Sequence, residues 1–271
     1  MALTKVLITV KTYPAISSKY EELVCTAGFL EDGTWIRIYP IQFRKKSYSE
    51  QYKKYDWIEL DLVKNSRDFR PESYRPYSID TDINIVEHIG TENNWAKRKR
   101  IVLQKVYFNL SELIAEAHNK EIRTSLAVFK PKKILDFKVE SVEREWDKKK
   151  LDSLRQMNLF ETVSISGKME VVRKLPYKFS YLFEDEAGTE SCLMIEDWEI
   201  GQLYWNCLAK YEGNEPKAIA DVRKKYFDDL AKTKDLHLFL GTSQVHHYQS
   251  RNPFMIIGTF HPTKELMRSL F

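Results

Sequence analysis

Two segments rich in β-branched and aromatic residues, 23–29 and 34–39, flank the turn Glu31-Asp32-Gly33-Thr34. The Asp-Gly pair supplies the positive φ of a tight hairpin, so two antiparallel strands are predicted here. Residues 3–10 form an apolar run typical of a buried strand, and residues 57–63 alternate between apolar and polar side chains. Four or five short strands within the first 90 residues favour a small barrel or sandwich over a parallel sheet.

The pattern changes after these strands, where helical and strand-like segments alternate. Asn94 is suited to cap a helix that begins at Trp95, and Ser111 to cap the next one. The charged segment 146–157 has a helical pattern and is interpreted as a connector. The sequence therefore predicts an α+β protein with an OB-like small β-barrel domain and helical insertion over residues 1–145, followed by a mixed helix/strand domain over residues 146–271.

The composition, 43% hydrophobic and 30% charged, is that of a folded protein. Cys25, Cys192 and Cys207 are far apart, which argues against a disulfide-stapled secreted protein. The N-terminus lacks the apolar core of a signal peptide, and no apolar stretch approaches the roughly 18 residues that span a bilayer. We therefore expect a cytoplasmic protein with no membrane partner.

Cationic and aromatic side chains are interleaved in the segment 42–55 and on the strand that precedes it. The net charge is only +4, so positive charge matters only where it is clustered. Cations offset phosphate charge and aromatic faces stack on unpaired bases, a mixture that suits single-stranded DNA or RNA. The predicted contacts from this region are Arg37, Tyr39, Arg44, Lys45, Lys46 and Tyr48. The alternative is a solvated loop whose aromatic rings pack onto a barrel.

The densest run of cations is Lys97-Arg98-Lys99-Arg100, which follows Trp95. Consecutive helical positions differ by about 100°, so the four side chains would surround a helix and attract phosphates diffusely rather than contact bases. Lys97, Arg98, Lys99 and Arg100 complete the predicted nucleic-acid-binding set. The alternative is an exposed helix end.

Two further segments are candidates for lining a groove. Residues 70–76 contain two prolines, each of which disfavours helix at the residue before it, so an extended strap is expected. His246 and His247 lie with polar neighbours in a loop between two predicted strands. Adjacent histidines do not form the i, i+4 zinc pair of helices, so ligand contacts by loop side chains are the functional interpretation. An ordinary connection and an exposed loop are the alternatives.

Seven acidic residues fall between positions 184 and 199, with no Lys or Arg among them. Carboxylates near strand ends can hold Mg²⁺ in a nuclease, but a turn and a helix start account for the same residues. A metal-dependent nuclease or base-processing enzyme therefore remains an alternative. Because no Rossmann, P-loop, nucleophile-elbow or zinc motif is present, we expect no cofactor and no metal, and we assign no catalytic residue.

Lys11-Thr12-Tyr13-Pro14, with residues 22–29 and 35–44, resembles the prokaryotic dual-OB-containing domain family over roughly the first 90 residues. The resemblance implies paired OB-like barrels and a nucleic-acid or nucleotide-binding module in a mobile-element or antiviral defence setting. It supplies no catalytic residue. The favoured hypothesis is a non-enzymatic protein that binds DNA or RNA, and a subunit whose aromatic surfaces pack on a protein partner is a further alternative.

Overall fold

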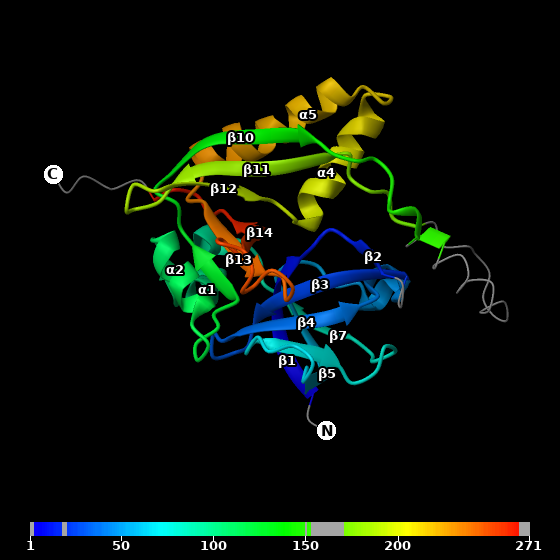
Figure 1. The fold of residues 1–271 in the computed structure, drawn as a ribbon. Coiled ribbons are helices and arrows are strands. Elements are labelled where there is room, and N and C mark those ends of the chain that lie inside the picture. The colour runs from blue at the N-terminus through cyan, green and yellow to red at the C-terminus, as the bar shows by residue number, and fades with distance from the viewer. Residues whose placement is uncertain (1–2, 18–20, 150, 153–170, 266–271) are drawn as a thin grey trace.

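The computed structural model describes residues 3–17, 21–149, 151–152 and 171–265. Five strands close into an N-terminal barrel, in which β1 pairs with both β3 and β5 (Figure 1). Strands β4 and β6 run parallel, and the other neighbours in the barrel are antiparallel. In barrel order, the strands are β1 (Leu3–Lys11), β3 (Glu21–Phe29), β4 (Trp35–Ile41), β6 (Ser73–Pro76) and β5 (Asp56–Lys64). Strand β2 (Ala15–Ser17) extends β3, and β7 (Asn84–His88) pairs with β5.

The predicted hairpin is confirmed between β3 and β4. Gly33 has φ of +83°, and the amide of Leu30 donates to the carbonyl of Thr34 at 2.9 Å. The Asp32 carboxylate accepts a hydrogen bond from the Thr34 amide at 2.8 Å and stabilises the turn. Apolar side chains of alternate positions then fill the barrel, as the period of a strand requires. Among them are Val6, Ile8, Ile36, Ile38, Ile58 and Leu60.

The C-terminal half consists of two further sheets with helices on them. Its strands are β8 (Val106–Tyr107), β9 (Leu126–Phe129), β10 (Lys133–Ser141), β11 (Tyr177–Glu184), β12 (Glu190–Met194), β13 (His237–Thr242) and β14 (Phe254–Phe260). One sheet has the order β10-β11-β12 and the other β14-β13-β9-β8, and a parallel bridge between Ile195 and Ile256 joins them. The mixture of helices and strands agrees with the predicted α+β class.

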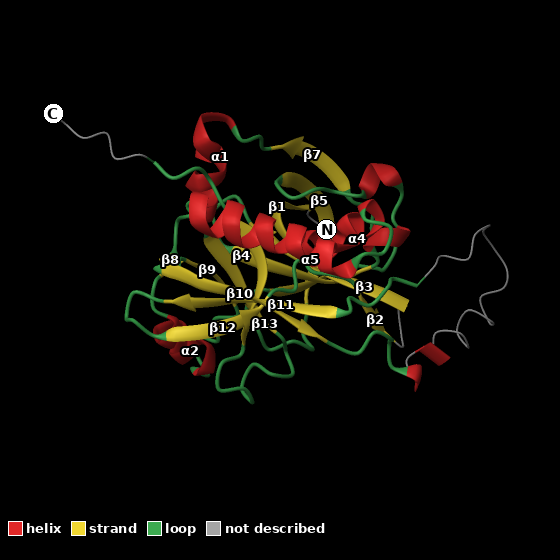
Figure 2. Cartoon of the chain, turned by 90° about the horizontal axis from the view of Figure 1, so that it is seen from above, coloured by secondary structure: helices red, strands yellow, loops and turns green. Residues whose placement is uncertain are grey.

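Four α-helices lie wholly within the described residues, and one of them continues as a π-helix. They are α1 (Glu92–Val102), α2 (Leu110–His118), α4 (Trp198–Lys210) and α5 (Glu215–Arg223), which leads into η3 (Lys224–Ala231). Figure 2 shows α5 crossing over β10 and β11. Two short 3-10 helices, η1 (Phe43–Lys45) and η2 (Tyr48–Glu50), lie in the β4–β5 connection. No helix in the described ranges combines the length and the apolarity that a membrane crossing needs.

Helix caps differ from those expected. Asn94 has a left-handed backbone and its side chain bonds the backbone of Thr263, so it caps no helix at Trp95. Helix α2 is capped by Asn109, whose side chain accepts from the amides of Ser111 and Glu112. Whether Asn94 or Asn109 caps a helix depends on its backbone conformation. Capping preferences alone therefore do not determine which of several nearby polar residues becomes the cap.

Strand ladders in the described residues run either among β1–β7 or among β8–β14. Strands β9 and β10 precede residue 145 and yet pair with β13 and β11. A boundary at residue 145 would therefore assign paired strands to different domains. Of the predicted helical connector 146–157, residue 150 and residues 153–157 lie outside the described residues.

A shared hydrophobic core joins the N-terminal barrel to the C-terminal half. Phe239 of β13 contacts Phe29 at 6.5 Å and Trp35 at 5.6 Å between ring centroids. Phe260 of β14 contacts Tyr55, with ring centroids 6.4 Å apart. Because these buried rings come from both parts of the chain, the two parts pack as one unit.

Candidate nucleic-acid interface

The β4–β5 connection holds most of the cationic and aromatic residues predicted to bind nucleic acid. Arg44 forms an ion pair with the buried Glu22 at 2.6 Å. The Lys46 ammonium donates to the carbonyl of Thr81 at 2.7 Å. Lys45 is exposed, and Tyr48 is 91% exposed. The connection therefore presents Lys45 and Tyr48 to solvent, whereas Arg44 and Lys46 also hold it on the barrel.

The cationic run on α1 divides between interior and surface, as a helix requires. The Arg98 guanidinium lies 3.7 Å from the centre of the Tyr55 ring and donates to the carbonyl of Ile89. Lys99 pairs with Glu265 at 2.7 Å. Lys97 and Arg100 are exposed. The Arg98 side chain was predicted to be a surface contact, but it is only 5% exposed. It is instead a buried side chain that packs α1 onto the barrel.

Arg37 was also predicted to be a surface contact, but its side chain is buried and only 2% exposed. Its guanidinium donates to the Ser125 hydroxyl at 2.8 Å and to the Ser125 carbonyl at 3.1 Å. Strand β4 turns Arg37 away from the barrel interior, and the C-terminal half covers that face. Tyr39, two positions further along the same strand, is 40% exposed. The coverage comes from packing between distant parts of the chain, which the local pattern of β4 does not contain.

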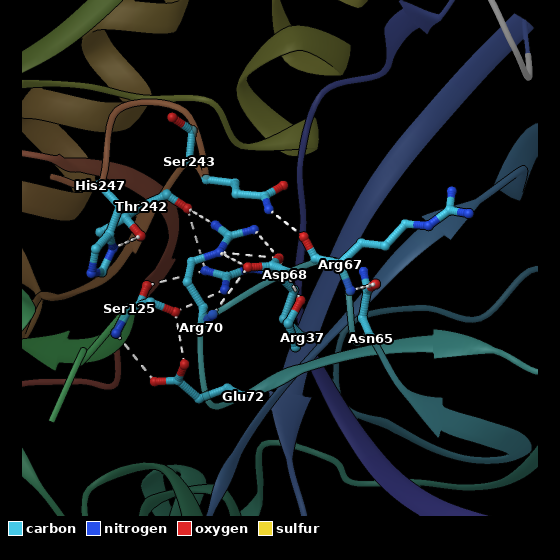
Figure 3. Close-up of polar contacts among 12 residues, drawn as sticks. Arg37, Asn65, Arg67, Asp68, Arg70, Glu72, Ser125, Thr242, Ser243 and His247 are labelled. Atoms are coloured by element: carbon cyan, nitrogen blue, oxygen red, sulfur yellow. Dashed lines mark hydrogen bonds and ion pairs between the residues drawn. The ribbon is translucent and has the colours of Figure 1, made fainter. Parts of the chain in front are cut away.

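Arg37 belongs to a buried polar network between the two parts of the chain (Figure 3). Arg70 donates through Nε and Nη2 to the carboxylate of Asp68 at 2.9 and 2.5 Å, and through Nη1 to the carbonyl of Thr242. Burial would raise the pKa of Asp68, but hydrogen bonds from Arg70 and Ser73 outweigh burial and lower it to about 2. The Asp68 carboxylate is thus ionised where it lies against the Arg70 guanidinium inside the molecule.

Glu72 supplies the second carboxylate of this network. It accepts hydrogen bonds from the Ser125 hydroxyl at 2.8 Å and from the Ser125 amide at 3.2 Å. Asp68 and Glu72 balance the charges of Arg37 and Arg70, which is the condition under which buried ions are tolerated. The network therefore fixes the C-terminal half against the β5–β6 connection.

Two loops next to this network contact each other. The Gln244 side-chain amide donates to the carbonyl of Arg67 at 2.6 Å. The rings of Phe69 and Tyr248 are stacked, with centroids 4.9 Å apart and an interplanar angle of 21°. The first loop, 65–72, connects β5 to β6, and the second, 243–253, connects β13 to β14. Parts of both loops were singled out in the sequence as separate candidates, and the structure brings them into contact.

His247 is not a surface residue of the second loop. Its ring bonds the Thr242 hydroxyl and the carbonyl of Ala117, each at 2.8 Å, and burial lowers its pKa. His246 beside it is exposed. The two adjacent histidines thus point differently, as expected, and only His246 is available to a ligand.

The two loops and strand β4, whose Arg37 bonds the carbonyl of Thr242, expose cationic, amide and aromatic side chains. We define the loop surface as the exposed residues Tyr39, Arg67, Gln244, His246, Tyr248 and Arg251. Figure 3 shows the Arg67 side chain extending away from the buried network. Within the described ranges, Arg67 and Arg251 form no ion pair. Sequence reasoning missed Arg67 and Gln244, because their partners lie more than 170 positions away.

The acidic residues considered for a nuclease have structural contacts. Asp185 is buried and accepts from the amides of Leu110 and Thr189. Asp197 pairs with Lys54 at 2.8 Å and accepts from the amide of Glu199 at the start of α4. No group of three or more His, Cys, Asp or Glu residues arranged to hold a metal ion occurs in the described part of the chain.

Comparisons with known proteins give two family matches and similarity to solved structures. A family described as "Domain of unknown function (DUF8758)" matches residues 2–104, and one described as "Domain of unknown function (DUF8757)" matches residues 107–271. No curated protein matches the chain. A solved structure titled "Structure of murine DNA binding protein bound with ds DNA" is similar with a TM-score of 0.32 and 11% identity, over 98% of each chain.

Proposed function

We propose that this chain, which belongs to the DUF8757 family through the match over residues 107–271, binds single-stranded DNA or RNA across the loop surface. The observation that carries the proposal is the contact between loops 65–72 and 243–253, made by Gln244 with Arg67 and by Tyr248 with Phe69. This contact brings the two loops together, and a surface that combines exposed cations and rings from both loops would suit a ligand with phosphates and bases.

The topology of the N-terminal barrel supports an OB-like assignment. In an OB-fold the first strand pairs with the second and the fourth, and the third strand runs parallel to the fifth. Strand β1 pairs with β3 and β5, and β4 is parallel to β6. Taken in chain order, β1, β3, β4, β5 and β6 thus correspond to the five strands of that fold.

The strand pairing in the C-terminal half supports the assignment of a second OB-like barrel. Strands β9 and β10, taken as one bent first strand, pair with β13 and β11. The bridge between Ile195 and Ile256 is parallel and links the end of β12 to β14, as third and fifth strands. We therefore propose a domain boundary near residue 105, between the two family matches, in place of residue 145.

The two loops that form the loop surface occupy equivalent places in these barrels. Each connects the fourth strand to the fifth, and this connection is one of the nucleic-acid-binding loops of OB-folds. Arg67 and Arg251 would contact phosphates, while Tyr39 and Tyr248 would stack on bases. Of the remaining predicted residues with exposed side chains, Lys45, Lys97 and Arg100 are proposed to add long-range attraction, and Tyr48 is proposed to offer a ring for stacking.

The proposal is tested by replacing Arg67 and Arg251 together with alanine. The variant is expected to bind a labelled single-stranded oligonucleotide at least about tenfold more weakly in fluorescence anisotropy, because two phosphate contacts are lost. The slope of log affinity against log salt should also become shallower by about one to two.

The matched control replaces Lys133 and Lys138, two exposed cations of β10, with alanine and so removes the same charge elsewhere. Its affinity should stay near that of the unchanged protein. Equal loss of affinity in both variants would show a diffuse charge effect, and no loss in either would remove the loop surface as the binding site.

A further inference from the structure

A cavity lies at the opposite end of the β13–β14 hairpin from the loop surface. In this hairpin Thr242 pairs with Phe254 beside the buried network, whereas His237 pairs with Phe260 at the other end. The cavity has a volume of about 570 Å³. Thr259 and His261 of the C-terminal half line it, together with residues of the N-terminal barrel, α1, α4 and η3. It is therefore distinct from the loop surface.

The charge at the cavity is positive. The positive charge of Lys54 is more than balanced, because its ammonium contacts the carboxylates of Asp197 at 2.8 Å and Glu199 at 2.9 Å. Lys53 and Lys225 also line the cavity and are exposed, and neither forms an ion pair with another described residue. Arg98 adds a third cation, which lies against the Trp95 ring at 4.8 Å. Such an excess of positive charge favours an anionic ligand.

The remaining wall is apolar and aromatic. Trp95 and Tyr226 contribute rings, and Leu203 and Leu230 contribute aliphatic side chains. Burial lowers the pKa of His261 to about 4, so its imidazole is neutral near pH 7 and can donate or accept one hydrogen bond. An aromatic ring of a ligand could pack on these side chains while the cations pair with its negative charge.

Tyr55 carries two features that point to a ligand. Its hydroxyl is buried and has no hydrogen-bond partner among the described residues, which is uncommon because burying an unpaired hydroxyl is costly. Its backbone φ is +69°, in a region that side chains other than glycine rarely adopt. Strain and an unpaired polar group at a cavity wall are typical of sites held in shape for binding.

We propose that this cavity binds a nucleoside phosphate, with the phosphate held by Lys53, Lys225 and Arg98 and the base beside Trp95. Its volume is within the range of about 300–1,000 Å³ that small-molecule sites occupy. The proposal does not depend on the loop surface, since it concerns a separate set of residues and a monomeric ligand.

To test binding, the full chain is titrated with adenosine monophosphate. Calorimetry measures the heat of binding, and fluorescence measures the change in tryptophan emission. Adenosine monophosphate should bind saturably at one site. Inorganic phosphate and adenosine should each bind at least about tenfold more weakly, because each supplies only half of the contacts. Absence of saturable binding, or equal affinity for inorganic phosphate, would overturn the assignment.

A pair of neighbouring variants locates the ligand. Lys225→Ala removes a cation at the cavity, and Lys224→Ala removes an exposed cation that does not line it. Lys225→Ala should weaken the binding of adenosine monophosphate about tenfold, and Lys224→Ala should leave it within about twofold. Equal effects would place the ligand elsewhere. The double variant Arg67→Ala with Arg251→Ala should leave the affinity for adenosine monophosphate unchanged. A negative result for the cavity can therefore be told apart from a negative result for the loop surface.

Discussion

Replacing Asp68 with asparagine is expected to lower the free energy of unfolding by about 3 kcal/mol, because it leaves the buried Arg70 guanidinium without the carboxylate that pairs with it. Asp68 is 8% exposed and binds Arg70 through both of its oxygens. The carbonyl of Thr242 accepts hydrogen bonds from both Arg70 and Arg37. Chemical denaturation at pH 7 measures the change.

Acid titration gives a second signature of the same carboxylate. The pKa of Asp68 is lowered to about 2, so its contribution to stability is complete above its ordinary pKa near 3.8. It is lost as the pH falls from there through 2, because the unfolded chain then binds the proton first. Stability of the Asp68→Asn variant should therefore depend less steeply on pH between 4 and 2.

The surface ion pair between Glu140 and Lys178 supplies a matched control. Its atoms are 2.8 Å apart, but both side chains are more than a third exposed. Glu140→Gln should cost less than about 1 kcal/mol, as is usual for solvent-exposed pairs. In the double variant Asp68→Asn with Arg70→Met, part of the lost stability should return. If Asp68→Asn and Glu140→Gln had the same small effect, the network would not hold the two parts together.

Replacing Phe239 with alanine is expected to cost about 3–5 kcal/mol, since the ring is fully buried and its removal leaves a cavity. Phe239 contacts Phe29 and Trp35 of the N-terminal barrel and Phe260 of its own half. The substitution thus weakens the core that joins both parts of the chain. Thermal unfolding followed by circular dichroism should show a much lower midpoint.

Phe108 is a suitable comparison, because its side chain is 46% exposed. Phe108→Ala should change the free energy of unfolding by less than about 1 kcal/mol. A similar small effect for Phe239→Ala would mean that the two parts of the chain do not depend on their shared core.

The strands and the hairpin of the first 90 residues could be predicted, because their signals are local. Asp32 and Gly33 specify the turn by backbone conformation alone, and the alternation in residues 57–63 specifies one buried face. The separation of Arg98 from Lys97 and Arg100 also follows from helical periodicity. These features need no knowledge of what packs against them.

The candidate site could be predicted only in part, because burial there arises from contacts across the chain. Tyr39 and Arg37 have the same local pattern, yet only Tyr39 remains exposed once Ser125 covers Arg37. Loops 65–72 and 243–253 each contain ordinary polar residues, and they meet only because strands that are far apart in the sequence pack together. No single segment of the sequence contains that packing.

Cross-linking of a photoreactive single-stranded oligonucleotide to the full chain, followed by mass spectrometry, tests most directly whether the two loops form one binding surface. We expect cross-linked peptides from both segments, with Tyr248 and residues next to Arg67 among the modified positions. Cross-links confined to α1 or to the β4–β5 connection, with neither loop modified, would contradict it.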